Sequence, residues 1–315
     1  MITKNKLTFL LVFIFAFQGC NWMNQDPYKN TPTTGRIKIC VDETFRPVAE
    51  AELQVFHAFY KYAEITPVFV PESEAFDLLL KDCTNLVIAS RPLSEYERAE
   101  FKKKKLFPDE VKVAMDAIAV IINPMNEDSV MSLNDLKSIL SGRITNWNQI
   151  NSASKSGEIK VIFDHEKSGT VRYMIDSVLN GTPLAKNLFA LDINTDVIKY
   201  VAENREAMGL IGVSWISDND DTLQLSFLKQ IKVLALSNEN VATWQNSFQP
   251  YQAYIFDQSY PLIRNIYAID TEPRNGLASG FLSFIASDKG QRIILKAGIL
   301  PANSPIRVVK IKEDI

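Results

Sequence analysis

Residues 111–122 read VKVAMDAIAVII, a long apolar stretch that is interrupted at its centre by Asp116. Strands of globular proteins usually have five or six residues, so this stretch is about twice as long as one sheet requires. We expect it to leave one sheet and to enter a second. The stretch therefore predicts two connected sheets.

Short strand-like runs alternate with helix-like runs on the N-terminal side of that stretch. The strand-like runs are Ile37–Val41, Val68–Val70 and Leu86–Ala89. The helix-like runs carry apolar residues at helical spacing (Ala49, Leu53, Phe56, Tyr60), span residues 75–81, or open with the capping box Ser94-Glu95-Tyr96-Glu97. An alternation of strand and helix predicts an α/β fold with a mostly parallel sheet.

The composition excludes disorder and does not indicate a nucleic-acid partner. Of 315 residues, 46% are hydrophobic and 23% are charged, so the chain can bury a large core, and its formal net charge is only −3. The basic residues between Arg98 and Lys105 would spread around a helix, which favours a solvated segment.

The N-terminus predicts export. Lys4 and Lys6 precede the apolar run Leu7–Phe17, which is too short to span a membrane and is typical of a signal peptide, here residues 1–19. Cys20 follows Gly19 as in a bacterial lipobox, which predicts a lipid anchor facing the periplasm or the cell exterior. A soluble secreted protein with an incidental Cys20 is the alternative. Residues 20–35 then form a polar tether.

The remaining cysteines, histidines and isolated acids carry less information. Cys40 and Cys83 are expected to fill apolar space in or near strands, and a disulfide between them stays open. The histidines do not stand at metal-ligand spacing, so we predict no metal site. We expect Glu52 and Asp135 to be solvated on amphipathic helices and Trp147 and Trp215 to pack in the core.

Small hydroxyl residues stand at four strand-to-helix junctions, where open α/β sheets bind ligands. The sequence Ser168-Gly169-Thr170 follows the strand-like run Lys160–Phe163 and offers two hydroxyls and several N–H groups without a Cβ at Gly169, which is chemistry for a tetrahedral anion. Each of these residues could instead be an ordinary N-cap. The four junctions carry Thr44-Phe45, Ser73, Ser90 and Ser168-Gly169-Thr170.

Several longer motifs together resemble the PstS-like family of phosphate-binding receptors of bacterial ABC importers. The resemblance covers nearly the whole chain after the tether. It rests on 42–47 (DETFRP), 89–94 (ASRPLS), 116–124 (DAIAVIINP), 133–147 (ending SGRITNW), 168–170 (SGT), 260–267 (YPLIRNIY) and 287–298.

This resemblance implies a two-lobed periplasmic binding protein of the type II class. Lobe I would comprise residues 36–115 and 262–315, lobe II would comprise residues 116–261, and each would hold a mostly parallel sheet flanked by helices. The resemblance implies a monomer that captures inorganic phosphate or a similar oxyanion for an ABC permease, without catalysis or cofactor. The lobes would close over the anion like a hinge.

Carried over by motif, the resemblance implies that Thr44, Phe45 through its N–H, Ser73, Ser90 and the residues 168–170 bind the anion. Two charges depart from the family pattern. Arg91 stands where the family has an acid after the serine, and Asp164 stands where it has an arginine four residues before the second serine.

The exchanged charges bear on selectivity, because a carboxylate can accept the proton of phosphate and repels sulfate, which has none. Asp164 could be this acceptor with Arg91 as the cation, or the two could form a structural salt bridge across the cleft. Arg172 could bind the anion or point to solvent. The fallback acceptors are Glu43, Glu72 and Glu166.

Two other functions remain open. A surface-anchored sensor or adhesion protein with a changed or lost ligand would explain the altered charges and the altered loop at Ser73. A phosphoester hydrolase would need Ser168 or Thr170 as nucleophile, with only Asp164 and His165 nearby as bases.

Overall fold

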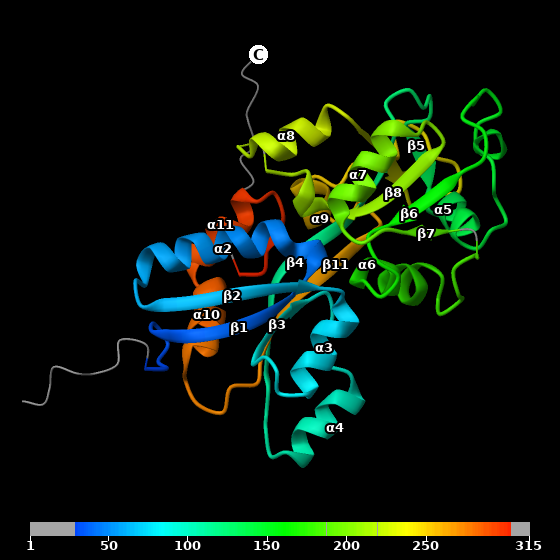
Figure 1. Cartoon of the computed structure of the whole chain (residues 1–315). Coiled ribbons are helices and arrows are strands. Elements are labelled where there is room, and N and C mark those ends of the chain that lie inside the picture. The colour runs from blue at the N-terminus through cyan, green and yellow to red at the C-terminus, as the bar shows by residue number, and fades with distance from the viewer. Residues whose placement is uncertain (1–28, 187, 219, 304–315) are drawn as a thin grey trace, which may run out of the picture.

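The computed structural model describes residues 29–186, 188–218 and 220–303 of the chain. It has a mixed α/β fold, as the sequence predicts (Figure 1). The strands are β1 (Gly35–Asp42), β2 (Ala63–Val70), β3 (Leu86–Ala89), β4 (Asp109–Ile122), β5 (Val130–Ser132), β6 (Lys160–Phe163), β7 (Phe189–Ala190), β8 (Ala207–Gly212), β9 (Lys232–Val233), β10 (Ala235–Ser237), β11 (Ile263–Asp270) and β12 (Leu300–Pro301).

Ten of these strands form one long sheet in the order β2-β1-β3-β11-β4-β8-β6-β7, with β9 and β12 also paired to β4, and β5 and β10 form a separate parallel pair. The pairs β1 with β2, β1 with β3, and β6 with β8 are parallel, while β4 and β11 run antiparallel to their neighbours. The first half of β4 pairs with β11, and its second half, Ile118–Ile122, pairs with β8. Residues 111–122 therefore pass from one group of strands to another, but both groups belong to one continuous sheet, so the expectation of two sheets is wrong.

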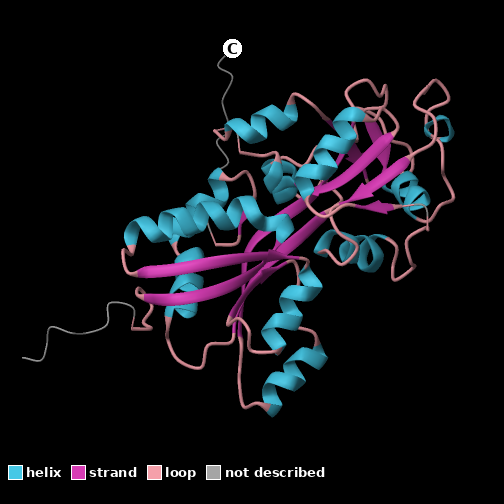
Figure 2. Ribbon diagram, in the orientation of Figure 1, coloured by secondary structure: helices cyan, strands magenta, loops and turns pink. Residues whose placement is uncertain are grey.

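Helices cover both faces of this sheet (Figure 2). The pairs α2 with α10 and α10 with α11 are in contact beside β1 and β4, whereas α3 packs on β1 and β3 and also contacts α4. The α-helices are α2 (Arg46–Phe59), α3 (Glu72–Leu80), α4 (Glu95–Lys103), α5 (Leu133–Leu140), α6 (Gly169–Tyr173), α7 (Asn194–Glu203), α8 (Thr222–Leu228), α9 (Gln252–Phe256), α10 (Leu277–Ala286) and α11 (Asp288–Lys296). Short 3-10 turns are η1 (Glu43–Phe45), η2 (Trp147–Gln149) and η4 (Val213–Trp215), and η3 (Met174–Val178) is a π-helical turn that continues α6.

Two apolar clusters hold these layers together. The larger one extends through both ends of the long sheet, and within it Phe56 of α2 packs edge-on against Phe281 and Phe284 of α10. The smaller one lies under α3 and α4 and includes Phe76 and Phe101. Helix α4 begins at Ser94 with the predicted capping box, in which Ser94 and Glu97 bond each other's backbone N–H.

Two predictions about single side chains in the core are wrong. Glu52 of α2 is not solvated: it is 2% exposed, and neither carboxyl oxygen has a hydrogen-bond partner. Its position on the helix points it into the apolar interior between α2 and the sheet. Cys40 is buried in β1 as predicted, but Cys83 is exposed, and both are free thiols, so they form no disulfide with each other.

The predicted signal peptide and Cys20 lie outside the described residues. Within the described ranges, no helix combines the length and the apolar character that a membrane span needs. The strands β4 and β11 are the elements that join the group around β1 to the group around β6, and Ile118 donates its N–H to the carbonyl of Leu262 at 2.9 Å. We keep the lobe boundaries near residues 116 and 262 as a proposal.

Candidate functional site

Three of the four predicted hydroxyl junctions meet at the centre of the molecule. Thr44 lies in η1 directly after β1, Ser90 directly follows β3, and Ser168 is the N-cap of α6. All three are buried, and so are Gly169 and Thr170. Because β1 and β3 are parallel neighbours and β6 points toward them from the other group of strands, the ends of these strands meet at one place (Figure 1). We call this buried junction between the two groups of strands the cleft.

Glu72 lies at the centre of the first set of donors. Its Oε2 atom accepts hydrogen bonds from the N–H of Ser90 at 2.9 Å and from the hydroxyl of Ser90 at 2.5 Å. Its Oε1 atom accepts from Nε of Arg172, whose Nη2 also donates to the Ser90 hydroxyl at 2.9 Å. Burial opposes ionisation, but Arg172, Ser90 and Arg91 outweigh it, so the pKa of Glu72 lies below its ordinary value.

Asp164 lies at the centre of the second set of donors. Its Oδ1 atom accepts the hydroxyl of Ser168 at 2.6 Å, and its Oδ2 atom accepts the hydroxyl of Thr44 at 3.0 Å and the amide of Asn194 at 3.3 Å. Asn194 also donates its amide to Glu43 at 2.6 Å. The carboxylates of Glu43 and Asp164 therefore join the group around β1 to the group around β6.

The sequence reasoning missed one buried arginine. Arg264 of β11 is 4% exposed, donates to Oδ2 of Asp116 at 2.9 and 3.0 Å, and donates to the hydroxyl of Thr170 at 3.3 Å. Its guanidinium also lies 4.8 Å from the ring centre of Phe45. Arg264 of β11 lies directly opposite Asp116 of β4. Two opposite charges, each in an otherwise apolar strand, were the signal in the sequence that could have indicated this buried ion pair.

Gly169 shows how tightly the cleft is closed. A Cβ atom at this position would lie 2.5 Å from Oδ2 of Asp42, 2.6 Å from the hydroxyl of Ser90 and 2.9 Å from Oε2 of Glu72. Glycine is therefore required sterically at residue 169, and side chains of the first group of strands lie directly against it.

Two further acids in the cleft are less well partnered. Burial, together with the charges of Glu72 and Asp164, raises the pKa of Asp42 to about 8, and its Oδ2 atom has no hydrogen-bond partner. Burial raises the pKa of Glu43 to about 7, although its bond to Asn194 opposes this shift. The cleft is consequently rich in carboxyl groups, with Arg172 and Arg264 as its buried or half-buried cations.

The structure does not bring Ser73 into this group. Helix α3 begins after Pro71, so Glu72 turns toward the cleft while Ser73 is exposed on the next position of the first turn. The backbone N–H of Ser73 donates to the carbonyl of Lys167 at 3.4 Å, which is a contact between the two groups of strands.

Arg91 and Asp164 do not pair with each other, so the alternative of a structural salt bridge between them does not hold. Arg91 donates two hydrogen bonds to Glu97 of α4 at 2.7 and 2.8 Å, stacks on Phe76 and lies 3.8 Å from Glu72. The capping box turns Glu97 toward Arg91, which explains this orientation. Arg172 instead provides the cation beside Ser90.

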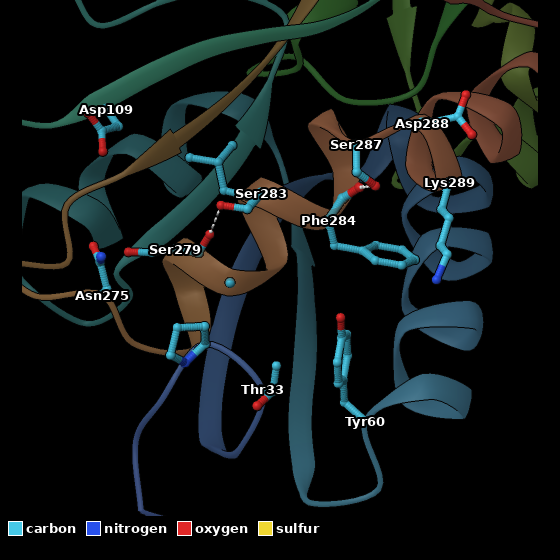
Figure 3. A pocket seen from close by; sticks show the side chains of 13 residues that line it. Thr33, Tyr60, Asp109, Asn275, Ser279, Ser283, Phe284, Ser287, Asp288 and Lys289 are labelled. Carbon is cyan, nitrogen blue, oxygen red and sulfur yellow. Dashed lines mark hydrogen bonds between the residues drawn. The ribbon is translucent and has the colours of Figure 1, made fainter.

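No group of three or more histidine, cysteine, aspartate or glutamate side chains could hold a metal ion among the described residues. A surface pocket of about 660 Å³ lies beside α10, where Tyr60, Phe284 and Lys289 surround an open space (Figure 3). Its acids, Asp109 and Asp288, and its single lysine do not assemble an anion site.

Two solved bacterial structures share this fold. A chain from Clostridium perfringens whose crystal structure contains bound phosphate matches with a TM-score of 0.71 and 21% identity, over 85% of this chain and 100% of that one. The ABC-type phosphate transport receptor of Vibrio cholerae matches with a TM-score of 0.63 and 19% identity, over 85% of this chain and 100% of that one.

Comparison of sequences leads to the same group. The phosphate-binding protein PstS of Staphylococcus saprophyticus is 25% identical over 261 residues, which cover 82% of this chain and 77% of that protein. The PstS protein of Staphylococcus aureus is 26% identical over 267 residues, which cover 83% and 77%. The model of the PBP superfamily domain matches residues 26–289. Since this match spans most of the chain, the protein belongs to the PBP superfamily, and the resemblance to its PstS-like members is confirmed.

Proposed function

We propose that this protein is an extracytoplasmic receptor that captures inorganic phosphate, or a similar tetrahedral oxyanion, in the cleft between its two groups of strands. The observation that carries this proposal is the convergence of Thr44, Ser90, Ser168, Thr170 and Arg172 from three separate segments: η1, the end of β3, and α6 with its N-cap. These are hydroxyl and guanidinium donors, and several of them already bind carboxylate oxygens in the structure. Donors that satisfy a carboxylate also suit a phosphate.

The family supports the same function and no chemistry on the ligand. The relatives at 25 and 26% identity are named phosphate-binding proteins, and a structural neighbour contains phosphate. We infer that the N–H of Phe45 and the residues 168–170 contribute to binding when the cleft admits the anion. Lobes joined near Asp116 and Leu262 would open and close to admit it.

Asp164 is the proposed acceptor that distinguishes phosphate from sulfate. Its Oδ1 atom accepts only the Ser168 hydroxyl, so this oxygen can accept a second hydrogen bond from a phosphate proton. Sulfate offers no proton at neutral pH and would meet the negative charge of the carboxylate without a hydrogen bond to it. An Asp164→Asn variant is therefore expected to bind phosphate less selectively.

Cleavage of the signal peptide and lipidation at Cys20 would hold the receptor at the membrane surface, where its closed form would be presented to an ABC permease. The polar tether of residues 20–35 would give it reach. Labelling with a radioactive fatty acid in a bacterial host should mark the wild-type chain and leave a Cys20→Ser variant unlabelled.

Calorimetric titration tests the binding function. The chain from residue 21 onward, stripped of anion, is titrated with phosphate and with sulfate at neutral and acidic pH. We expect binding of phosphate and weak or no binding of sulfate at neutral pH. The double variant Ser168→Ala, Thr170→Ala should weaken phosphate binding at least a hundredfold, whereas Ser283→Ala, which removes an exposed hydroxyl on α10, should not change it.

A surface-anchored sensor or adhesion protein is the second candidate. The carboxyl groups of Asp42, Glu43, Glu72 and Asp164 in one closed cleft favour it, because an ionised carboxylate such as that of Glu72 repels an incoming anion. Absence of phosphate and sulfate binding in the same titration would make it the leading function.

A further inference from the structure

Glu72 occupies donors that an oxyanion would use. Four donors from three residues surround its carboxylate: the N–H and hydroxyl of Ser90, Nε of Arg172, and, at 3.8 Å, Nε of Arg91. A backbone N–H, a hydroxyl and guanidinium groups arranged around two oxygens are what a bound phosphate or carboxylate ligand requires. In this structure the ligand is a side chain of the protein itself.

The carboxylate of Glu72 also lies where the second group of strands would present its own anion donors. Its Oε2 atom would be 2.9 Å from a Cβ at Gly169, the central residue of the segment 168–170. Only the absence of that Cβ allows such a close approach. A phosphate bound by both Ser90 and this segment would need the space that the Glu72 carboxylate fills.

The contacts of Glu72 connect the two groups of strands. Glu72 and Ser90 follow β2 and β3, whereas Arg172 belongs to α6, which follows β6. The side chain of Glu72 is 2% exposed, while that of Arg172 is 29% exposed, so the ion pair is screened on one side only. The neighbouring contact from Ser73 N–H to the Lys167 carbonyl lies at the same junction.

We propose that Glu72 acts as an internal substitute for the ligand: its carboxylate closes the cleft in the absence of an oxyanion, and an incoming oxyanion must displace it. This inference rests on the proposed function for the identity of the ligand. Glu72 then lowers the affinity for the oxyanion, because the hydrogen bonds of Glu72 to Ser90 and Arg172 must break each time an oxyanion binds.

The opposite role for Glu72 makes an opposite prediction. A Glu72 that accepts the proton of phosphate would stabilise the bound state, and its removal would weaken binding. The acceptor role requires an oxygen that can turn to the ligand, whereas Oε2 of Glu72 already accepts two hydrogen bonds from Ser90, and Oε1 lies against the guanidinium groups of Arg172 and Arg91.

The test compares Glu72→Gln with Glu74→Gln, which changes an exposed glutamate of the same helix. Each variant and the wild type, from residue 21 onward and stripped of anion, is titrated calorimetrically with inorganic phosphate. Small-angle X-ray scattering without phosphate gives the radius of gyration. We expect Glu72→Gln to bind phosphate at least tenfold more tightly and to have a larger radius of gyration, and Glu74→Gln to match the wild type in both.

Two results overturn the inference. One is a phosphate affinity of Glu72→Gln equal to or weaker than that of the wild type, and the other is an unchanged radius of gyration. If neither the wild type nor Glu72→Gln binds phosphate, the proposed function fails. The scattering alone then tests whether Glu72 holds the cleft closed: a larger radius of gyration of Glu72→Gln supports this role, and an unchanged one contradicts it.

Discussion

Two buried glutamates of the first group of strands, Glu52 and Glu72, have opposite environments. Each is 2% exposed. Glu72 accepts hydrogen bonds from Ser90 and Arg172, and its pKa is lowered despite its burial. Neither oxygen of Glu52 has a partner, and burial alone raises its pKa to about 9.

The two residues are equally buried, so this difference shows that hydrogen-bond and ion-pair partners decide whether a buried acid is charged. Glu52 borders a small cavity between α2, β3, β4 and the C-terminal helices, where the other lining residues are apolar: Val48, Ala49, Ile88, Val113, Ala114, Ile266, Ile285, Ile294 and Ile299. An acid in such a place is neutral at pH 7 and has a structural cost. An acid surrounded by fixed hydrogen-bond donors, as Glu72 is, lies in an environment that stabilises negative charge.

The largest effect is expected when a partnered acid loses its partner. Arg264→Leu leaves Asp116 buried without its cation, which makes Asp116 resemble Glu52. Breaking a buried ion pair typically costs about 3–5 kcal/mol, and we expect a loss of that size in urea denaturation at pH 7. Arg292→Leu, which removes an exposed ion pair with Asp288, is the control and should cost little. A loss below about 1 kcal/mol for Arg264→Leu would show that Asp116 does not depend on it.

The second effect has the opposite sign. Because the folded pKa of Glu52 lies near 9 and its ordinary value is 4.5, Glu52 does not disfavour folding below about pH 4 and disfavours it increasingly as the pH rises toward 9. Glu52→Leu should therefore raise stability by on the order of 3 kcal/mol at pH 8 and by much less at pH 5. Thermal unfolding at both pH values measures this, with the exposed Gln54→Leu as control. A gain that does not change with pH would contradict the neutral state of Glu52.

The smallest effect concerns Asp42, whose environment lies between these two extremes. Burial and the charges of Glu72 and Asp164 raise its pKa to about 8, while Arg264 and the Thr44 N–H oppose this shift. Since the folded pKa is above the ordinary value of 3.8, protonated Asp42 favours folding at acidic pH, and this contribution is lost as the pH rises to 8.

Asp42→Asn should remove that dependence while keeping an acceptor for the Thr44 N–H. Relative to the wild type, the variant should gain about 1–2 kcal/mol of stability between pH 5 and pH 8. Urea denaturation across this range measures the difference. Parallel curves for the two proteins would mean that Asp42 is ionised throughout.

Much of the fold was predictable because apolar periodicity and capping residues act locally. The strands at residues 37–41 and 160–163, the capping box at Ser94 and the long crossing strand at residues 111–122 all appear as expected. The burial of Glu52 was not predictable. Its helix is amphipathic by sequence, and the helices α10 and α11, which also pack on α2, come from residues more than 220 positions away.

The site was predictable only where a residue follows directly from its strand. Thr44, Ser90 and Ser168 meet as expected, but helix α3 begins one turn earlier than residues 75–81 indicate, and a rotation of about 100° per residue then directs Glu72 and not Ser73 inward. Arg172, and not Arg91, is the cation that contacts Ser90, because Arg91 pairs with Glu97. Such choices depend on partners that only the folded chain brings together.

A crystal structure of the wild-type protein grown with phosphate tests the central claim most directly. We predict phosphate bound to Ser90, Arg172 and the residues 168–170, with the Glu72 side chain moved away from Ser90 and Arg172. Phosphate in this cleft with both bonds of Glu72 still in place would contradict the account, and so would phosphate bound at another site.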